Sequence, residues 1–360
     1  MTDRESVEQL LSSFEDPLTG ESLVAGNALA GVAGEGGRLA VDIRLGYPAA
    51  GIREELAEQI RQYLLDNGAF EAITVQVSSR VVAHQVQDKL MPLPEVKNVI
   101  AVASGKGGVG KSTTAVNLAL ALQAEGAAVG LLDADIYGPS QPRMVGASGR
   151  PDSEDGRSIE PKISHGLQTM SIGYLIDEDT PMVWRGPMVT QALQQLISDT
   201  NWCGLDYLIV DMPPGTGDIQ LTLSQRVPVS GAIIVTTPQD IALLDAKKGL
   251  RMFEKVSVPV LGVVENMSTH ICAKCGHEEA IFGSGGGATM AEQYNVALLG
   301  QLPLDLRIRE QTDSGRPTVL AEPDSDLAAR YRDIARRAAA ALSRQARSSA
   351  GQFPNIVIKS

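Results

Sequence analysis

A glycine-rich run near residue 105 carries the clearest chemistry in this 360-residue sequence. Gly105, Gly110, Lys111 and Ser112 fit the phosphate-loop pattern G-x-x-x-x-G-K-[ST], between an apolar run and helix-forming residues. Glycines let backbone N–H groups turn inward around an anion, and the following helix adds free N–H groups and its positive dipole end. Lys111 is placed to contact the β- and γ-phosphates, and the Ser112 hydroxyl to bind Mg²⁺. The run therefore predicts a nucleotide site.

Lys106 gives this loop a second lysine. A single triphosphate held by backbone amides and Lys111 leaves little room for it, so we expect Lys106 to reach elsewhere; the alternative is a solvated loop lysine. The residues expected to bind nucleotide from this loop are Gly105, Lys106, Gly107, Gly108, Val109, Gly110, Lys111, Ser112 and Thr113.

Carboxylates follow two apolar runs that are typical of buried strands. Asp133 and Asp135 come at the end of one run, and Asp211 ends Tyr207-Leu-Ile-Val-Asp, the Walker B arrangement. Two carboxylates at i and i+2 on a strand end face one way, so both could approach the γ-phosphate or its magnesium. We therefore expect magnesium to involve Ser112, Asp133 and Asp211. The alternative for the first pair is two solvated turn aspartates.

Cys272 and Cys275 form a C-x-x-C pair, and the chain has only one other cysteine, too few for a disulfide framework. Two thiolates at this spacing supply half of the four ligands that tetrahedral zinc or a 4Fe-4S cluster requires. A two-fold dimer would present the pair twice and complete the set. Two alternatives stay open: a Cys₂His₂ zinc site with His270 and His277, and an unliganded or redox thiol pair.

Together these segments resemble the deviant Walker A ATPases, K-G-G-x-G-K-[ST], and among them the Mrp/ApbC iron–sulfur cluster carriers. The resemblance is carried by the loop, by Asp133-Ala-Asp-Ile-Tyr-Gly-Pro-Ser, by Asp211-Met-Pro-Pro-Gly-Thr-Gly-Asp and by the Cys-x-x-Cys-Gly-His run. It covers residues 95 to about 340 well. The front of the chain resembles, more loosely, the small domain often fused to these carriers and found alone in iron–sulfur assembly factors.

The resemblance implies a role for each matching residue. Members of the family sandwich ATP between two subunits, so Lys106 would act across a homodimer on the partner's nucleotide. Asp135 would orient or activate the attacking water, giving Lys106, Lys111 and Asp135 as the catalytic set. Asn266 matches the asparagine that holds the adenine edge. Cys272 and Cys275 would hold a 4Fe-4S cluster on the dimer axis, passed to apo iron–sulfur proteins with cluster assembly factors as further partners.

Two other functions share the loop and the dimer. A partitioning or division-site ATPase would act as a nucleotide-dependent switch, here with a structural zinc, and a nitrogenase-reductase type of protein would donate electrons. The net charge of −12 argues against nucleic-acid partners. No apolar run approaches the roughly 20 residues that span a bilayer, and Met1–Ser6 has no signal-peptide character. We therefore expect a cytoplasmic protein without membrane contact.

The elements that must position these residues are those of an α/β protein. From Val99 onward, β-type runs alternate with helical ones, which predicts a P-loop NTPase with a mostly parallel sheet flanked by helices. The expected strands are Val99–Ala103, Ala128–Asp133, Tyr207–Asp211, Gly231–Thr236, Val260–Val264 and Ala297–Leu302. We expect a small α/β domain at 1–82, a linker at 83–96, the ATPase domain at 97–347 and a C-terminal tail at 348–360.

A helix near the end of the chain has one apolar face and one face rich in arginine. The apolar face consists of Leu327, Tyr331, Ile334, Ala338 and Leu342. A basic amphipathic helix can lie on a membrane. Because this apolar face is diluted by alanine, the sequence favours packing against the ATPase domain.

Overall fold

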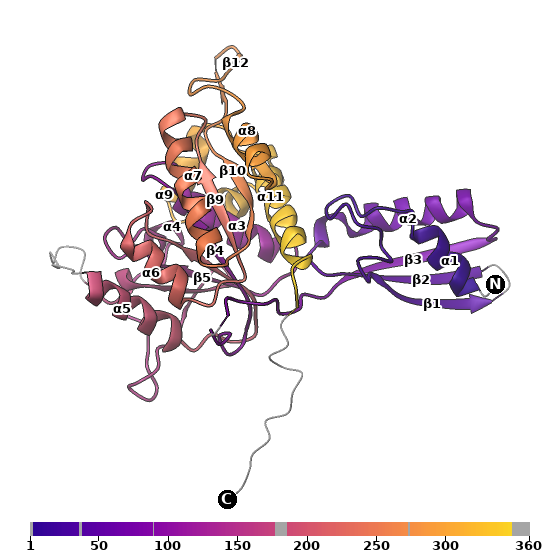
Figure 1. The fold of residues 1–360 in the computed structure, drawn as a ribbon, viewed down its shortest axis with the longest axis horizontal. Helices are drawn as coiled ribbons and strands as arrows, with labels where there is room; N and C mark the ends of the chain where they lie inside the picture. Colours follow the sequence, from indigo (N-terminus) through magenta and orange to yellow (C-terminus); the bar gives the residue numbers. More distant parts are fainter. Residues whose placement is uncertain (1–2, 36–37, 89, 177–185, 273, 348–360) are drawn as a thin grey trace, which may run out of the picture.

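The computed structural model describes residues 3–35, 38–88, 90–176, 186–272 and 274–347. It has a large part built on a wide sheet and a smaller part that carries the N-terminus (Figure 1). The tail expected at 348–360 lies outside the described residues. The α/β class and the small additional N-terminal sheet agree with the expectation from the sequence.

The small part is a three-stranded sheet with two helices on one face (Figure 1). Its elements are α1 (Asp3–Leu11), β1 (Leu29–Glu35), β2 (Arg38–Leu45), α2 (Arg53–Asn67) and β3 (Ala72–Ser79). The central strand, β2, pairs antiparallel with β1 and parallel with β3, and its residues alternate between exposed and buried. Helix α2 buries Leu56, Ile60 and Leu64 against this sheet. The other sheet face therefore carries the polar residues of β2.

The large sheet has eight strands in the order β13-β10-β9-β4-β8-β5-β7-β6. They are β4 (Val96–Ala103), β5 (Val129–Asp133), β6 (Lys162–Ser164), β7 (Leu167–Ser171), β8 (Leu205–Asp211), β9 (Gly231–Thr236), β10 (Val260–Glu265) and β13 (Leu298–Gln301). Only the edge strand β6 pairs antiparallel among the described strands of this sheet. All six expected strands are present, whereas the pair β6 and β7 was not expected, because both are short and polar residues interrupt them.

Helices cover both faces of the large sheet (Figure 1). Ile100 and Val102 of β4 belong to the core beneath α3 (Lys111–Ala124) and α11 (Asp326–Ser343), with α10 (Thr318–Ala321) and α9 (Leu306–Asp313) beside them. The alternate residues of β4 belong to a second core. That core is covered by α5 (Gly186–Ser198), α6 (Asp218–Arg226), α7 (Asp240–Lys255) and α8 (Gly286–Gln293). The C-terminal helix thus packs against the ATPase sheet, as expected, with its five apolar residues buried.

Polar contacts at the ends of α3 and α11 join the two parts. Glu125, at the end of α3, accepts the Gly51 backbone N–H at 2.8 Å, and within the large part it pairs with Arg336 of α11 at 2.7 Å. At the end of α11, Arg344 pairs with Glu21 at 2.9 Å. The Glu125 carboxylate is almost fully buried, so its ion pair is only weakly screened by solvent. The small part is therefore held against the carboxyl end of α11.

Candidate nucleotide and cysteine sites

The phosphate loop connects β4 to α3, and its glycines are required by its geometry. Gly108 and Gly110 have φ angles of +84° and +83°, in the region that side chains disfavour. A Cβ on Gly110 would lie 2.1 Å from the Asn266 amide nitrogen, and one on Gly105 would lie 2.1 Å from the backbone of Asp245 in α7. The loop thus packs closely between α7 and the residue that follows β10. Its backbone forms the start of α3, where an anion would bind.

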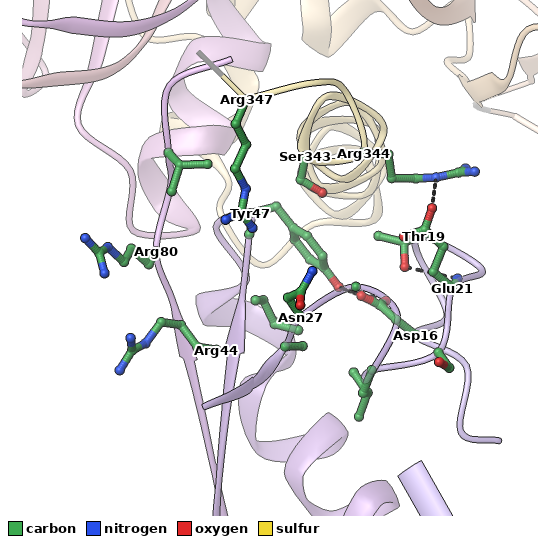
Figure 2. Close-up of a pocket in the computed structure, with 17 residues that line it drawn as sticks. Asp16, Thr19, Glu21, Asn27, Arg44, Tyr47, Arg80, Ser343, Arg344 and Arg347 are labelled. Atoms are coloured by element: carbon green, nitrogen blue, oxygen red, sulfur yellow. Dashed lines mark hydrogen bonds and ion pairs between the residues drawn. The ribbon is translucent and has the colours of Figure 1, made fainter. Parts of the chain in front are cut away.

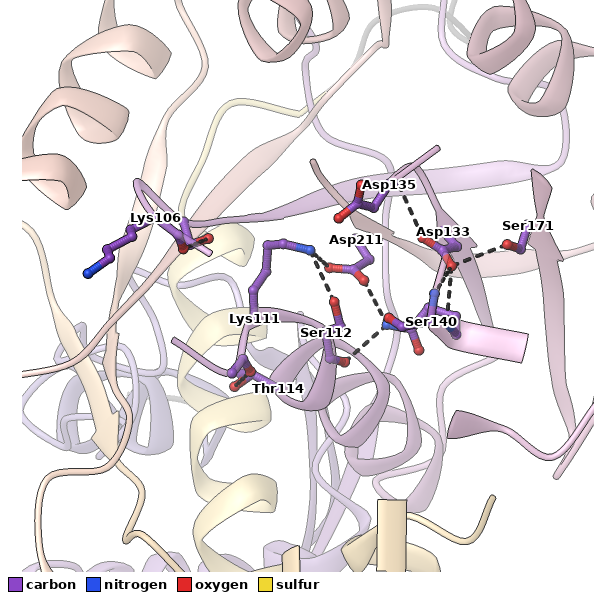
Figure 3. A network of polar contacts seen from close by, with 12 residues as sticks. Lys106, Lys111, Ser112, Thr114, Asp133, Asp135, Ser140, Ser171 and Asp211 are labelled. Carbon is purple, nitrogen blue, oxygen red and sulfur yellow. Dashed lines mark hydrogen bonds and ion pairs between the residues drawn. The ribbon is translucent and has the colours of Figure 1, made fainter. Parts of the chain in front are cut away.

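Lys111 is buried at the first turn of α3, where its ammonium group contacts the carboxylate of Asp211 (Figure 3). The same ammonium lies 3.2 Å from the Ser112 hydroxyl. Asp211 ends β8, the strand next to β4, and has no exposed surface. The structure thus brings together three of the four residues expected to contact the phosphates and magnesium, namely Lys111, Ser112 and Asp211.

Gln141 also belongs to this cluster, although sequence reasoning did not select it. It lies at the start of α4 (Gln141–Met144), and its amide donates to Asp211 at 2.8 Å and to the Ser112 carbonyl at 3.0 Å. Its own Oε1 and the Ser140 hydroxyl are buried without a hydrogen-bond partner among the described residues. Carboxylate, amide and hydroxyl oxygens are the ligands that Mg²⁺ accepts, directly or through water. The residues present therefore fit the ion.

Asp133 makes four hydrogen bonds inside the protein (Figure 3). Its carboxylate accepts the backbone N–H groups of Asp135 at 3.1 Å, Ser140 at 2.9 Å and Gln141 at 3.0 Å, and the Ser171 hydroxyl at 3.2 Å. Burial and the nearby Asp211 charge raise the pKa of Asp133 well above its usual range. In this geometry Asp133 positions the turn that carries Asp135 and Gln141. The expected contact with magnesium remains a prediction.

Asp135 is half-buried and lies beside Asp211 (Figure 3). Burial raises its pKa, the charge of Lys111 lowers it, and the charge of Asp211 raises it again. The net effect is a raised pKa for Asp135, and its carboxylate lies at the same cluster as Lys111 (Figure 3). It can therefore approach a ligand bound on the phosphate loop.

Lys106 has a different environment. It is exposed, and its side chain points away from Lys111 and the carboxylates (Figure 3). The Ser104 hydroxyl donates to the Lys106 carbonyl at 2.9 Å and holds the backbone of this part of the loop. Gly107 is exposed beside Pro214, and Thr113 is half-buried in the first turn of α3. Lys106 is thus free to contact a group outside its own loop.

Asn266 follows β10 and is 8% exposed. Its amide donates to the Val109 carbonyl at 2.8 Å. This contact places Asn266 against the phosphate loop, at the edge of the sheet where a nucleotide bound to the loop would extend. The predicted contact with adenine remains a prediction.

The cysteine pair lies in a short hairpin formed by β11 (His270–Ile271) and β12 (Glu278–Glu279), which protrudes from the large part (Figure 1). The Cys272 N–H donates to the His277 carbonyl at 2.9 Å, and the Gly276 N–H donates to the Cys272 carbonyl at 2.8 Å. Cys272 is half-buried and Cys275 is exposed. The backbone N–H groups of Lys274 and Cys275 hold the pKa of the Cys272 thiol below its usual value, which favours the thiolate that binds metal.

The two histidines of the possible zinc site are not gathered around these thiols. His270 directs its Nδ1 to the Leu304 carbonyl at 3.1 Å, and His277 is exposed. In the part of the chain that the structure describes, no three His, Cys, Asp or Glu side chains are grouped to hold a metal ion. Among the described residues, the hairpin therefore provides two thiols but no group of four zinc ligands.

A phosphate loop on a mostly parallel sheet, with Lys111 and the Walker B carboxylate in contact, defines a P-loop nucleotide-binding protein. The family described as NUBPL iron-transfer P-loop NTPase matches residues 95–339, and the iron–sulfur cluster assembly protein family matches residues 4–77. The chain belongs to the first of these families, and its N-terminal part matches the second. This confirms the family predicted from the sequence.

Individual proteins agree with this assignment. An iron–sulfur cluster carrier protein from Escherichia coli K12 is 54% identical over 340 residues, which are 94% of this chain and 92% of the relative. A solved nucleotide-binding protein from Archaeoglobus fulgidus in complex with ADP is 34% identical, with a TM-score of 0.56 over 65% of this chain and 91% of that one. The cell division ATPase MinD from Pyrococcus furiosus, at 22% identity and a TM-score of 0.50 over 67% and 97%, shares the fold. No helix among the described residues is long and apolar enough to cross a membrane.

Proposed function

We propose that this protein is a homodimeric, slow ATPase that holds a 4Fe-4S cluster on its two-fold axis and transfers it to apo-proteins in the cytoplasm. The observation that carries the proposal is the hairpin with the two free thiols of Cys272 and Cys275 at its end. A 4Fe-4S cluster takes four thiolates, so a second copy of the hairpin supplies the other two. Iron–sulfur carriers among the relatives support the same cargo.

The nucleotide half of the proposal rests on the buried cluster around Lys111. On ATP binding, the Lys111 ammonium would exchange the Asp211 carboxylate for the β- and γ-phosphates. Ser112 and Asp211 would then hold Mg²⁺, which neutralises charge on the phosphates. Gln141 keeps the Asp211 carboxylate in position. Asp135 would orient the attacking water from the rim of the same site.

Lys106 would supply a cation to the nucleotide of the partner subunit. Its exposed side chain points out of its own site, so in a face-to-face dimer it can contact the partner's nucleotide. A cation delivered in this way stabilises the charge of the transition state and contributes about 10³- to 10⁵-fold in rate in related reactions. Hydrolysis is therefore slow unless the dimer closes. Dimer closure also sets the distance between the two hairpins, which couples the nucleotide to retention of the cluster.

Anaerobic reconstitution with iron and sulfide tests this proposal. We expect wild type to gain one oxygen-labile cluster per dimer, with four irons and four sulfides per two chains and visible absorption. Cys272→Ser and Cys275→Ser should each abolish it. Cys203→Ser is the matched control, because Cys203 is exposed but lies away from the hairpin, before β8.

Two outcomes would contradict the proposal. A cluster that survives in Cys272→Ser would place the cargo elsewhere. One tightly bound zinc per chain, lost in His270→Ala or His277→Ala, would instead indicate a nucleotide-dependent switch with a structural zinc.

A further inference from the structure

The small sheet has one long edge that no described strand covers. Strand β3 pairs with β2 in an unbroken parallel register over all eight of its residues, and among the described residues no strand pairs with its other side, the free edge of β3. Its sequence, Ala-Ile-Thr-Val-Gln-Val-Ser-Ser, contains no charged residue, proline or glycine. Edge strands are usually protected by such residues, by bulges or by short length, because their free N–H and C=O groups otherwise pair with another strand.

The other long-sheet edges in the described part of the chain have this protection. Strand β1 contains two glycines, and its register with β2 shifts between Leu29 and Gly31. At the edges of the large sheet, β6 has three residues, one of them Lys162, and β13 has four. The free edge of β3 is therefore the one most open to the addition of a strand.

The chain that follows α11 already pairs with the continuation of β3. Arg347 pairs antiparallel with His84, and the Gln85 N–H donates to the Ala346 carbonyl at 2.9 Å. Figure 2 shows Arg347 together with Arg80, which lies on the segment that leads from β3 to this pairing. A short antiparallel ladder thus begins where the described chain reaches residue 347.

This ladder lies on the side of β3 that faces away from β2. The Arg80 N–H donates to the Leu45 carbonyl of β2 at 2.8 Å. Residues 80–83 are neither helix nor turn. Because N–H groups alternate between the two sides of an extended chain, the Gln85 N–H points to the side opposite β2, where Arg347 follows α11. An antiparallel continuation beyond Arg347 therefore passes along the free edge of β3.

Residues 348–360 lie outside the described residues, and their sequence contains a run typical of a strand. It reads Ser-Ser-Ala-Gly-Gln-Phe-Pro-Asn-Ile-Val-Ile-Lys-Ser. Ile356, Val357 and Ile358 are β-branched, the side-chain type that is enriched in strands. Pro354 cannot donate to a ladder, but it precedes this run, in a position that strands tolerate. The sequence thus supplies a short strand at a suitable distance from α11.

The register defined by the His84–Arg347 bridge would place apolar side chains together. Counted one residue for one residue from the bridge, Ile356 falls opposite Val75 and Ile358 falls opposite Ile73. Ile73 is buried in the core beneath α2, and Val75 is half-buried against the same core. Residues directly opposite each other in an antiparallel pair share one face of the sheet, and β-branched pairs stabilise it. The two isoleucines would therefore extend the buried face.

We propose that residues 355–359 add to the free edge of β3 in the same chain, as a fourth strand antiparallel to it. The strand would pair with the N–H and C=O groups of Ile73 and Val75. Because it follows α11 of the large part whereas β3 belongs to the small part, the pairing would fasten the two parts to each other. It uses no residue of the nucleotide or cysteine sites, so this inference stands apart from the proposed function.

Residue-resolved amide exchange on the full chain tests the pairing. Thr74 is an even number of residues from Arg80, so its N–H points to β2, whereas the N–H groups of Ile73 and Val75 point to the free edge. We expect all three to be protected in wild type. Ile356→Lys puts a charge against the apolar face and should speed exchange at Ile73 and Val75 at least about tenfold, with Thr74 less affected.

Val357→Lys is the matched control for this variant. Val357 falls opposite Thr74, whose side chain is exposed on the other face of the sheet. This variant should keep exchange at Ile73 and Val75 within about twofold of wild type. Rapid exchange at both residues in wild type, or equal exchange in all three proteins, would overturn the inference.

A disulfide identifies which copy of the chain supplies the strand. Thr74→Cys/Val357→Cys, with the three natural cysteines replaced by serine, creates a pair whose Cα atoms would lie about 4.5 Å apart, which a disulfide can span. We expect mild oxidation to link the two cysteines within one chain. Thr74→Cys/Ile356→Cys is the control and should not link, because its side chains project from opposite faces. A link between two chains would assign the strand to a second copy and overturn the inference, as would the absence of any link.

Discussion

The side-chain amide of Asn266 donates to the backbone carbonyl of Val109 at 2.8 Å. This hydrogen bond joins the phosphate loop to the segment that leads from β10 into the cysteine hairpin, which begins at His270. Both β4 and β10 pair parallel with β9, so the loop and the hairpin leave the sheet at the same edge. The nucleotide site and the thiols are thus connected through one short segment.

Replacing Asn266 by alanine should loosen the phosphate loop. The Val109 carbonyl loses its donor in a buried position, which costs about 1–2 kcal/mol. We expect nucleotide affinity to fall about five- to thirtyfold, as measured with a fluorescent ADP analogue. Asn201→Ala, at an exposed asparagine far from the loop, should leave affinity unchanged. Wild-type affinity in Asn266→Ala would show that the loop does not need this contact.

The two loop lysines should give different defects. Lys111→Ala removes a buried cation from the phosphate site and should weaken ATP binding and abolish hydrolysis. Lys106→Ala should keep ATP binding within about twofold while hydrolysis falls at least about 10³-fold, because an exposed lysine acts only across the dimer. Lys97→Ala is the control. This lysine lies on β4, the strand that leads into the loop, and it is paired with Asp206 of β8. Parallel losses of binding in both loop variants would argue against a role in trans, as measured by phosphate release.

Gln141→Leu should separate magnesium use from nucleotide binding. The variant removes the donor that holds the Asp211 carboxylate and the Ser112 carbonyl. We expect ADP affinity without metal to remain near wild type, the magnesium concentration for half-maximal hydrolysis to rise about tenfold, and stability to fall about 1–3 kcal/mol. Gln168→Leu, whose side-chain amide hydrogen-bonds the Cys203 backbone, controls for loss of an amide. An unchanged magnesium concentration for half-maximal hydrolysis would show that Gln141 does not support magnesium binding.

The sequence predicted the large sheet because its strands are apolar runs with regular helical segments between them. Gly231–Thr236 was expected and found with the same bounds. Strand β1, Leu-Ala-Gly-Val-Ala-Gly-Glu, was not expected, since two glycines and two alanines weaken its β pattern. Strand β6 is short and pairs with β7 at the sheet edge. Tertiary pairing, not local preference, forms these strands.

The candidate site also contains residues that the sequence could predict and residues that it could not. Lys111 and Ser112 belong to the phosphate loop and Asp211 to the Walker B run, two motifs that follow apolar strands, so the sequence was sufficient to predict a shared site for them. Gln141 belongs to no motif, and its place depends on the turn that the buried Asp133 holds through its hydrogen bonds. The ion pair between Glu21 and Arg344 also could not be predicted from the sequence, because these residues are 323 positions apart and meet only through the docking of α11. Such contacts follow from packing between distant segments.

We expect His84 to make the free energy of unfolding depend on pH. This residue lies beside the segment that follows α11. It is 2% exposed, its Nδ1 lies 2.9 Å from the Asn98 side-chain oxygen, and its backbone pairs with that of Arg347. Burial lowers the pKa of His84 below its ordinary value of 6.5, and the nearby charge of Arg347 lowers it further. The unfolded chain therefore binds this proton first as the pH falls, and the free energy of unfolding decreases below pH 6.5.

His84→Gln removes this titration while keeping an amide that can face Asn98. We expect the difference in unfolding free energy between wild type and the variant to be constant above pH 7 and to shrink as the pH falls toward about 5.5, by about 1.4 kcal/mol for each pH unit over which only the unfolded histidine is charged. Urea unfolding at a series of pH values measures it. Other titrating groups contribute equally to both proteins and cancel in the difference. A constant difference across the whole range would mean that His84 takes up its proton equally well in the folded and unfolded chain, and that burial at the α11 junction does not hold it neutral.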